Sequence, residues 1–179
     1  MDDLDRALRT VEAIHSRVDA RARALARRHR GRLQCRRGCH ACCVDDLTVF
    51  EVEAERIRRA HGALLATGRL HPTGGCAFLD EDGGCRIYGE RPYVCRTQGL
   101  PLRWLSEDRD EIVESRGICE LNREGPPLGG LDEEACWTVG PVELELGRLQ
   151  EGLDGGRRRR VALRSLFGGS SSGDGSADS

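Results

Sequence analysis

Hydrophobic residues recur at steps of three and four along the first thirty positions of the chain. This spacing keeps them on one face and predicts a single helix from residue 2 to about residue 30. Aspartates crowd its start and arginines crowd its end, which is the arrangement that the helix dipole favours. The apolar stripe consists of Leu4, Leu8, Val11, Ile14, Val18, Ala22 and Leu25.

Two further helices are predicted from the same kind of pattern. Thr48 and Glu51 have the spacing of a capping box, which predicts a helix over 49–68 with the glycine at its end as the C-cap. A last helix is expected from about residue 132 to residue 149, with a break or kink near positions 140–141, a Gly-Pro pair.

The segments between and after these helices show little periodicity. Residues 71–99 are rich in glycine, residues 106–124 are rich in acids, and strand patterns are weak throughout. The run GGRRRR (155–160) and the tail (168–179) contain too few apolar residues to order themselves. The fold class predicted by the pattern is mainly α, with irregular loops in the middle of the chain.

The charged residues exclude several kinds of chemistry. The 179 residues contain 28 basic and 30 acidic side chains, a net charge of −2, and every basic side chain is an arginine. Without lysine, the chain has no Schiff-base amine and no phosphate-binding P-loop. Nine arginines and one acid lie from Arg17 to Arg37, a run that indicates either a nucleic-acid contact or a solvated helix end. No aromatic residues interleave for base stacking, so we favour the helix end and expect no nucleic-acid partner.

Nine cysteines in a chain of this length indicate either disulfides or metal. The amino terminus is acidic and lacks the apolar core of a secretory signal. No stretch approaches the roughly 20 apolar residues of a membrane span. These features predict a cytoplasmic protein without a membrane partner. Thiols stay reduced in that compartment, so we expect the cysteines to bind metal.

The first cysteine cluster, C-x3-C-x2-C-C, comprises Cys35, Cys39, Cys42 and Cys43. Closely spaced thiols lose little entropy when they close around an ion, so structural metal sites use such spacing. The same residues would also share one face of a helix, but Gly38 and the flanking arginines disfavour a core helix. The adjacent pair at 42–43 serves two metals or bridges one polynuclear centre, and the sequence leaves both open.

A second cluster comprises Cys76, Cys85 and Cys95, and Cys119 follows alone. The Asp-Gly-Gly sequence at 82–84 predicts a turn before Cys85. Pro92 predicts an extended conformation for Arg91, which suits a chain that wraps around a ligand. Several arginines lie beside the cysteines and would offset thiolate charge, namely Arg36, Arg37, Arg86 and Arg96.

The combined cysteine pattern resembles a known family. C-x3-C-x2-C-C, followed by C-x-F-L, G-x-C-x-I-Y and R-P-x-x-C-R, is similar to the YkgJ-type cysteine-cluster family of zinc- or iron-chelating proteins. The resemblance covers about residues 35–122, places the R-P pair at Arg91 and Pro92, and leaves Cys136 outside the pattern. It implies metal binding with zinc, iron or a [4Fe-4S] cluster as the cofactor. The implied ligands are Cys35, Cys39, Cys42, Cys43, Cys76, Cys85, Cys95 and Cys119.

With this resemblance, the predicted architecture is a small, irregular, metal-stapled domain. It divides into an N-terminal amphipathic helix (1–34), a cysteine-cluster metal-binding domain (35–125), a C-terminal helix (126–156) and an arginine run with a disordered tail (157–179). Burial alone should not order the middle of the chain, because apolar side chains are scarce there, so we expect metal to be part of its fold. Cys136 is expected within a helix, as a small hydrophobe packed against the core.

Other side chains near the cysteines carry weaker signals. Eight thiols already fill two four-coordinate sites, so we interpret His40 as a surface imidazole. We expect Tyr88 and Tyr93 to pack in a small core and not to donate hydrogen bonds to sulfur. The remaining histidines are expected on helix surfaces or in loops, namely His15, His29, His61 and His71.

Three kinds of function fit these features. The first is a small metal- or iron–sulfur-binding protein in redox transfer, metal handling or assembly, and we favour it. The second is an iron–sulfur-dependent enzyme, either an oxidoreductase or a protein methylase, since flagellin lysine-N-methylases resemble the cysteine pattern within a longer chain. The third is a structural zinc module of an interaction protein. The sequence assigns no catalytic residue and no protein partner, and whether the chain is an enzyme stays open.

The spacing of Cys35, Cys39 and Cys42 is also that of radical S-adenosylmethionine enzymes. Those enzymes normally place an aromatic residue before the third cysteine, where this chain has Ala41. They also need a partial barrel of alternating strands and helices, which the pattern does not show. We therefore do not favour this interpretation.

Overall fold

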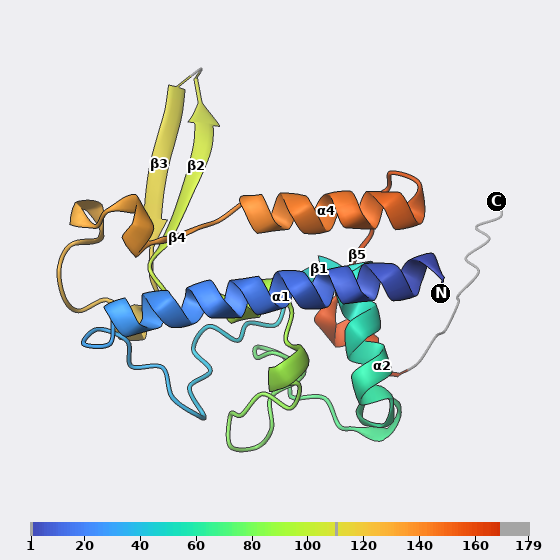
Figure 1. Cartoon of the computed structure of the whole chain (residues 1–179). Coiled ribbons are helices and arrows are strands. Elements are labelled where there is room, and N and C mark those ends of the chain that lie inside the picture. Colours follow the sequence, from blue (N-terminus) through green and yellow to red (C-terminus); the bar gives the residue numbers. More distant parts are fainter. Residues whose placement is uncertain (1, 110, 169–179) are drawn as a thin grey trace, which may run out of the picture.

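A long helix, α1 (Asp3–Arg28), runs along the molecule (Figure 1). The structure is a computed structural model that describes residues 2–109 and 111–168. The carboxylate of Asp2 caps the helix by accepting the amide hydrogen of Asp5 at 2.7 Å. The helix predicted for this part of the chain is therefore confirmed.

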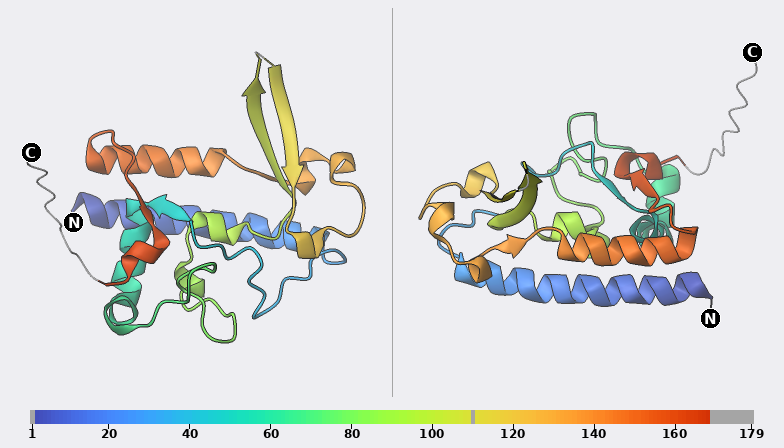
Figure 2. Two further views of the ribbon diagram at one scale, coloured as in Figure 1. Left: turned by 180° about the vertical axis from the view of Figure 1, so that it is seen from behind. Right: turned by 90° about the horizontal axis from the view of Figure 1, so that it is seen from above.

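Helix α4 (Pro141–Asp154) lies antiparallel to α1 and packs against it (Figures 1 and 2). The prediction that this helix starts near residue 132 is wrong, because Gly140 has a φ of +117° and Pro141 takes the first helical position. The residues before it form a 3-10 helix (Glu133–Ala135) and strand β4 (Trp137–Thr138). The apolar cluster around α1 and α4 includes Leu8, Val11, Ile14, Val18, Leu25, Tyr93, Trp137 and Leu146.

Helix α2 (Glu51–Thr67) confirms the second predicted helix but not its capping box. Thr48 lies in strand β1 (Thr48–Phe50), and its hydroxyl oxygen accepts a hydrogen bond from Nε of Arg160 at 3.1 Å. Strand β1 pairs antiparallel with β5 (Arg160–Ala162). The chain therefore enters the helix directly from a strand, and its N-cap residue, Phe50, makes no side-chain capping bond. The amide of Val52 in the first turn donates instead to Oε1 of Gln150 in α4 at 2.8 Å.

A three-stranded mixed sheet makes the expected fold class only partly right. Strands β2 (Leu102–Asp108) and β3 (Glu111–Gly117) form an antiparallel hairpin, and β4 pairs parallel with β2, giving the order β3-β2-β4. The hairpin stands away from the body of the molecule (Figures 1 and 2). Its exposed strands do not alternate between apolar and polar residues, so no strand pattern was visible. The exposed apolar residues of the hairpin include Trp104, Leu105, Ile112 and Val113.

The chain beyond α4 returns to the body of the molecule. The prediction that the arginine run cannot order itself is wrong, because Arg160 pairs with β1 and its guanidinium lies 4.5 Å from the ring of Phe50. A 3-10 helix (Leu163–Leu166) then enters a second apolar cluster with Ile57 and Phe78. Most of the predicted disordered tail, residues 169–179, lies outside the described residues.

The cysteine-rich middle of the chain consists of turns and short helices, as expected. In the view of Figure 1 it lies below α1, whereas α4 lies above. Its regular elements are helix α3 (Tyr93–Arg96) and 3-10 helices at Tyr88–Glu90 and Glu120–Asn122, and a further 3-10 helix follows at Leu128–Gly130. No helix in the described part of the chain has the length and apolar content needed to cross a membrane.

Candidate metal centre

The first cysteine cluster lies in a series of turns between α1 and β1. The amide of Cys39 donates a hydrogen bond to the carbonyl of Arg36 at 2.9 Å, and the amide of Cys43 donates to the carbonyl of His40 at 2.8 Å. Gly38 has a φ of +80°, a conformation that favours glycine. The cluster is therefore not one face of a helix.

Cys85 follows a tight turn that Asp80 organises. The carboxylate of Asp80 accepts the amide hydrogens of Asp82 at 3.0 Å and Gly84 at 2.6 Å, and Gly83 has a φ of +76°. The turn predicted before Cys85 is thus confirmed. The part played by Asp80 was not visible in the sequence.

Cys95 lies in α3. Arg91 has the extended conformation that Pro92 predicts, with φ −54° and ψ 139°. The amide of Cys95 donates to the carbonyl of Pro92 at 3.0 Å, and Glu53 of α2 accepts the amide hydrogen of Tyr93 at 2.7 Å. A buried carboxylate of α2 therefore fixes the start of the helix that carries Cys95.

Backbone and side-chain bonds bring the two cysteine clusters together. The amide of Cys76 donates a hydrogen bond to the carbonyl of Cys43 at 2.9 Å. Arg164, from the C-terminal 3-10 helix, forms an ion pair with Asp45 and donates to the carbonyl of Gly75 at 2.9 Å. Arg164 thus binds both the segment after Cys43 and the segment before Cys76. The sequence did not indicate this role.

Asn122 plays a similar part for Cys35. Its side-chain nitrogen donates to Sγ of Cys35 at 3.3 Å and to the carbonyl of Gly99 at 2.8 Å, and its side-chain oxygen accepts the amide hydrogen of Gln34 at 2.7 Å. The 3-10 helix that contains Asn122 starts directly after Cys119. The lone Cys119 is therefore brought to the first cluster by a buried amide.

We define the outer group as Cys35, Cys39, Cys42 and Cys119. Burial raises the pKa of Cys35, the hydrogen bond from Asn122 lowers this pKa, and the charges of the other three thiols raise it further. Each of these three thiols lies close enough to Cys35 for its charge to act on that thiol. The structure thus groups Cys119 with three cysteines of the first cluster.

We define the inner group as Cys43, Cys76, Cys85 and Cys95. Burial raises the pKa of Cys76 and Cys85, and it raises the pKa of Cys95 to about 12. The charges of Cys76 and Cys85 add to the raised pKa of Cys95, and those of Cys76 and Cys95 add to the raised pKa of Cys43. The four thiols are therefore linked in pairs, with Cys76 and Cys95 each acting on Cys43 and close to Cys85.

The adjacent cysteines at 42 and 43 stand where the two groups meet. Their thiols are hydrogen-bonded to each other, which lowers the pKa of Cys42 to about 6 and raises the pKa of Cys43. Cys42 belongs to the outer group because its charge acts on Cys35. Cys43 belongs to the inner group because the charges of Cys76 and Cys95 act on it. Consecutive residues thus direct their sulfur atoms to different sets of thiols.

The two groups bring thiols near one another without assembling a finished ligand sphere. Across residues 2–109 and 111–168, no three Cys, His, Asp or Glu side chains are placed so that they could hold a metal ion as they stand. The donor chemistry does fit a soft cation, because each group offers four thiols and zinc and iron bind thiolates. A bound cation would also lower the thiol pKa values that burial raises.

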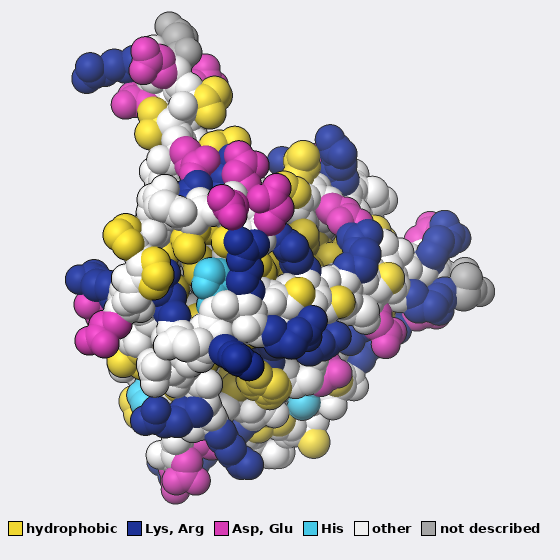
Figure 3. All heavy atoms as spheres, turned by 60° about the vertical axis from the view of Figure 1, so that its left-hand side comes forward, with side chains coloured by type: hydrophobic (Ala, Val, Ile, Leu, Met, Phe, Trp, Pro, Cys, Tyr) yellow, Lys and Arg dark blue, Asp and Glu magenta, His cyan; other side chains and the backbone are white. Residues whose placement is uncertain are grey.

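The predicted arginines have unequal roles. Arg86 lowers the pKa of Cys76, whereas Arg96 turns to α1 and donates to Asp19 at 2.7 Å. Arg36 and Arg37 are exposed. Figure 3 faces the end of the molecule where α1 terminates and shows arginine side chains spread across it.

The aromatic and histidine predictions are only partly right. Tyr93 is buried and its hydroxyl accepts a hydrogen bond from Nε1 of Trp137 at 3.0 Å, whereas Tyr88 is exposed beneath the guanidinium of Arg91. His40 is exposed as expected. The placement of His15 and His29 on the surface is wrong, since both are buried. His15 lies 2.9 Å from Glu53, and His29 lies 2.7 Å from the carbonyl of Ala135.

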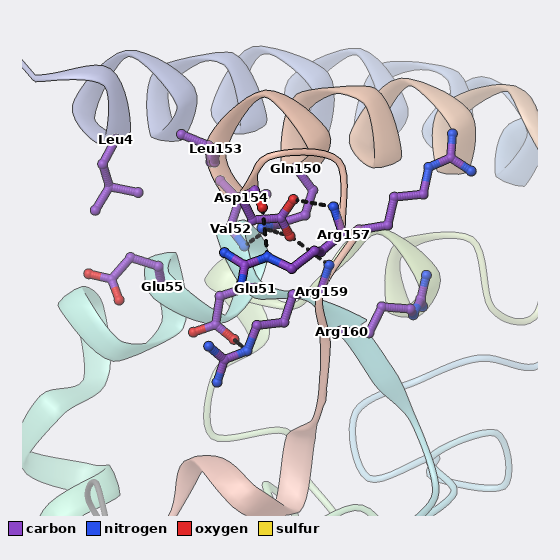
Figure 4. A pocket seen from close by; sticks show the side chains of 11 residues that line it. Leu4, Glu51, Val52, Glu55, Gln150, Leu153, Asp154, Arg157, Arg159 and Arg160 are labelled. Carbon is purple, nitrogen blue, oxygen red and sulfur yellow. Dashed lines mark hydrogen bonds and ion pairs between the residues drawn. The ribbon is translucent and has the colours of Figure 1, made fainter. Parts of the chain in front are cut away.

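A cavity of about 700 Å³ lies elsewhere, between the start of α2 and the end of α4 (Figure 4). Its lining contains Arg157 to Arg160 and the carboxylates of Glu51, Glu55 and Asp154, but no cysteine. Asp154 accepts the amide hydrogens of Arg157 at 2.9 Å and Arg159 at 2.8 Å. Among the lining charges, Arg159 pairs with Glu51 at 3.8 Å, whereas Arg158 and Arg160 form ion pairs with Glu151 and Glu143 outside the lining.

Cys136 is separate from both groups. Its side chain is 2% exposed, and burial is the largest cause of its raised pKa. The charges that act on this pKa come from Arg116, Glu114, Arg103 and Arg28, and not from a thiol. The prediction of a buried small hydrophobe is confirmed, but Cys136 lies between a 3-10 helix and β4, not in an α-helix.

Comparison with protein families finds a match over the segment that carries both thiol groups. The CxxCxxCC family model, described as "Putative zinc- or iron-chelating domain", matches residues 34–120. Residues 34–120 are therefore similar to a CxxCxxCC domain. The matched segment contains all eight cysteines of the inner and outer groups, and Cys136 lies beyond its end. No curated protein and no solved structure matches the chain.

Proposed function

We propose that the matched segment of this chain, residues 34–120, binds a soft metal at two centres, each with four cysteine thiolates. The observation that carries the proposal is the division of eight thiols into two groups of four. Four thiolates are the ligand set of a closed tetrahedral zinc site and equally of an iron–sulfur cluster. The split between Cys42 and Cys43 explains how adjacent cysteines serve two centres.

Metal binding would complete the fold of the cysteine-bearing loops. The thiols of each group are neighbours but do not yet converge, so a cation would draw several segments together. Arg86 and Arg164 near Cys76, and Arg91 near Cys85 and Cys95, would offset part of the thiolate charge. The energy of metal binding would then contribute directly to the stability of this region.

The site favours metal handling over catalysis. The cavity of Figure 4 has no cysteine in its lining, so the proposed centres and this cavity are separate. All nine cysteines are free thiols, the state in which they bind metal and which a reducing compartment such as the cytoplasm maintains. Our proposal includes this compartment and a role in which the protein binds zinc or iron in order to store it, transfer it or assemble it into clusters.

Analysis of the purified protein for metal and acid-labile sulfide tests this function. The full-length chain would be prepared without oxygen, and zinc, iron and sulfide would be measured per chain. Two zinc ions without sulfide would indicate two tetrathiolate sites, and iron with an equal amount of sulfide would indicate clusters. A chain that retains neither metal, even after reconstitution with each, would contradict the proposal.

A further inference from the structure

The inner thiol group is embedded in the apolar core. Cys76 is 8% exposed and belongs to the cluster that contains Phe78, Leu79 and Ile87. Cys43 and Cys85 pack against the same cluster. To expose these thiols, the apolar contacts of the C-terminal segment and α2 must open as well. Cys43, Cys85 and Cys95 are half-buried, as are Cys39, Cys42 and Cys119, so the inner group differs from the outer group by its apolar packing, which must loosen before its ion leaves.

The outer thiol group has a different environment. None of its four cysteines belongs to either apolar cluster of the described residues, and Cys35 is exposed. Polar contacts hold it in place instead, chiefly the hydrogen bonds of Asn122 to Cys35 and to Gln34. Few buried apolar contacts and an exposed sulfur are features of segments that open at low cost.

We propose that the two groups differ in function, so that the inner group holds a structural metal ion and the outer group holds an exchangeable one. The inference rests on the proposed metal-binding function and assigns a different role to each of its two metal ions. The outer ion would be the cargo that the protein receives and delivers. The inner ion would stay with the chain and keep its loops folded.

The surface around the outer group indicates the chemistry of the acceptor. Arg30, Arg36 and Arg37 are exposed on the turns around Cys35, and Figure 3 shows arginines across this end of the molecule. Such a surface attracts an anionic acceptor that offers thiols of its own. When a bond between the metal and a sulfur atom of the chain breaks, a bond between the metal and a sulfur atom of the acceptor would replace it. A proton released by the acceptor's thiol would pass to the freed cysteine, and the metal would keep its oxidation state.

Release kinetics from the zinc-loaded, full-length chain test the inference. Zinc would be transferred to an excess of a chromogenic chelator, and its appearance would be followed with time. We expect two phases of about one equivalent each, with the first about tenfold faster or more, because only the second requires core opening. After the first phase, rapid alkylation and mass spectrometry should find modified thiols at the outer group and protected thiols at the inner group.

Two matched variants assign the phases. Cys39→Ser and Cys85→Ser each replace a half-buried cysteine that follows a glycine, one in each group. Cys39→Ser should lose the fast phase and keep the slow one. Cys85→Ser should lower the thermal midpoint of unfolding more than Cys39→Ser does. If Cys85→Ser does not fold, the alkylation pattern of the wild-type chain still decides.

The outcomes separate this inference from the proposed function. A chain that binds no metal would contradict both. Two equivalents released in a single phase, or a first phase that exposes thiols of both groups together, would overturn the division into structural and exchangeable ions. That result would leave the proposed binding of metal at two four-thiolate centres in place, with both ions exchanging at the same rate.

Discussion

The side-chain amide of Asn122 donates a hydrogen bond to Sγ of Cys35 at 3.3 Å, although 87 positions separate them in the sequence. Asn122 is fully buried, and its two other hydrogen bonds reach Gly99 and Gln34. One side chain therefore joins the first cysteine cluster, the segment after Cys95 and the segment after Cys119. An amide hydrogen bond also stabilises a thiolate relative to a thiol, which favours metal binding.

Replacement of Asn122 should loosen the outer group. Asn122→Ala removes three hydrogen bonds and leaves the part-buried amide of Gln34 and the buried carbonyl of Gly99 without this partner, so we expect a loss of about 2–3 kcal/mol of unfolding free energy. Zinc release from the outer group should be faster. Urea unfolding and chelator kinetics measure the two effects.

Asn122→Asp provides the comparison, because it keeps the oxygen that Gln34 contacts and loses the N–H groups. It should be less destabilising than Asn122→Ala before metal is added, yet it should also weaken the outer site, since a carboxylate repels the thiolate of Cys35. Unchanged release from both variants would show that Asn122 does not position this cysteine.

Gly99 is the second contact on which Cys35 depends. It has a φ of +85°, and a Cβ there would lie 2.6 Å from Sγ of Cys35. We expect Gly99→Ala to displace this sulfur and to lower the metal affinity of the outer group, in addition to the backbone strain of about 1 kcal/mol that alanine incurs at positive φ.

Gly74→Ala isolates the backbone effect. Gly74 has a φ of +99°, but a Cβ there meets nothing within 4 Å. Its alanine variant should show a similar strain and normal zinc content. Equal zinc content in the two alanine variants would mean that Sγ of Cys35 can move aside without a loss of metal affinity.

Local signals in the sequence predicted the parts of the fold that depend on local structure. The apolar stripe and terminal charges of α1 were sufficient to place it, and the Asp-Gly-Gly turn before Cys85 was evident from its residues. The eight cysteines were assigned from their spacing and resemblance. Their division into two groups of four was not predicted, because it depends on how Cys119 and Cys76 fold against the first cluster.

Features that depend on partners distant in the sequence were either not predicted or predicted wrongly. Thr48 has the capping-box spacing, but pairing of its strand with Arg160 and its neighbours overrides that local preference. Asn122 and Arg164 carry no motif, and their roles arise only because the chain returns to the cysteines from far along the sequence. Long-range contacts of this kind leave no periodic pattern for sequence reasoning to detect.

Acid should destabilise the protein through His15. Its imidazole is buried between α1 and α2, and burial is the largest cause of its lowered pKa; the charges of Arg96 and Arg56 lower it further, while Glu53 opposes them. The unfolded state therefore binds a proton at higher pH than the folded state does. The stability that neutral His15 provides is complete above the unfolded pKa of about 6.5 and is lost as pH falls below that value.

The comparison of wild type with His15→Gln isolates this contribution. Glutamine donates to Glu53 without titrating, so the variant should lose less unfolding free energy between pH 7 and pH 5, by up to about 1.4 kcal/mol per pH unit. Metal content must be equal in the two proteins, because acid also protonates thiolates. Parallel pH profiles would contradict a neutral, buried His15.

Cys136 is the one cysteine outside the proposed ligand set, so its replacement tests that set. Cys136→Ser should keep the full metal content and cost about 1–3 kcal/mol, since a polar hydroxyl would be buried in place of the thiol. Cys95→Ser should remove a centre and lower the thermal midpoint further. Metal per chain and thermal unfolding compare the two, and a loss of metal from Cys136→Ser equal to that from Cys95→Ser would require a different ligand set.

Removal of all metal should unfold the middle of the chain and leave the helical layer. The apolar cluster around α1 and α4 contains none of the eight cysteines of the two groups, so its burial does not depend on metal. Residues 71–122 consist mostly of turns, short helices and an exposed hairpin, and the proposed centres would join their segments. Chelation should therefore reduce amide hydrogen-exchange protection from Cys76 to Cys119 and preserve it in α1. Readdition of zinc should restore the lost protection, whereas native protection from Cys76 to Cys119 in the metal-free chain would show that the loops fold without metal.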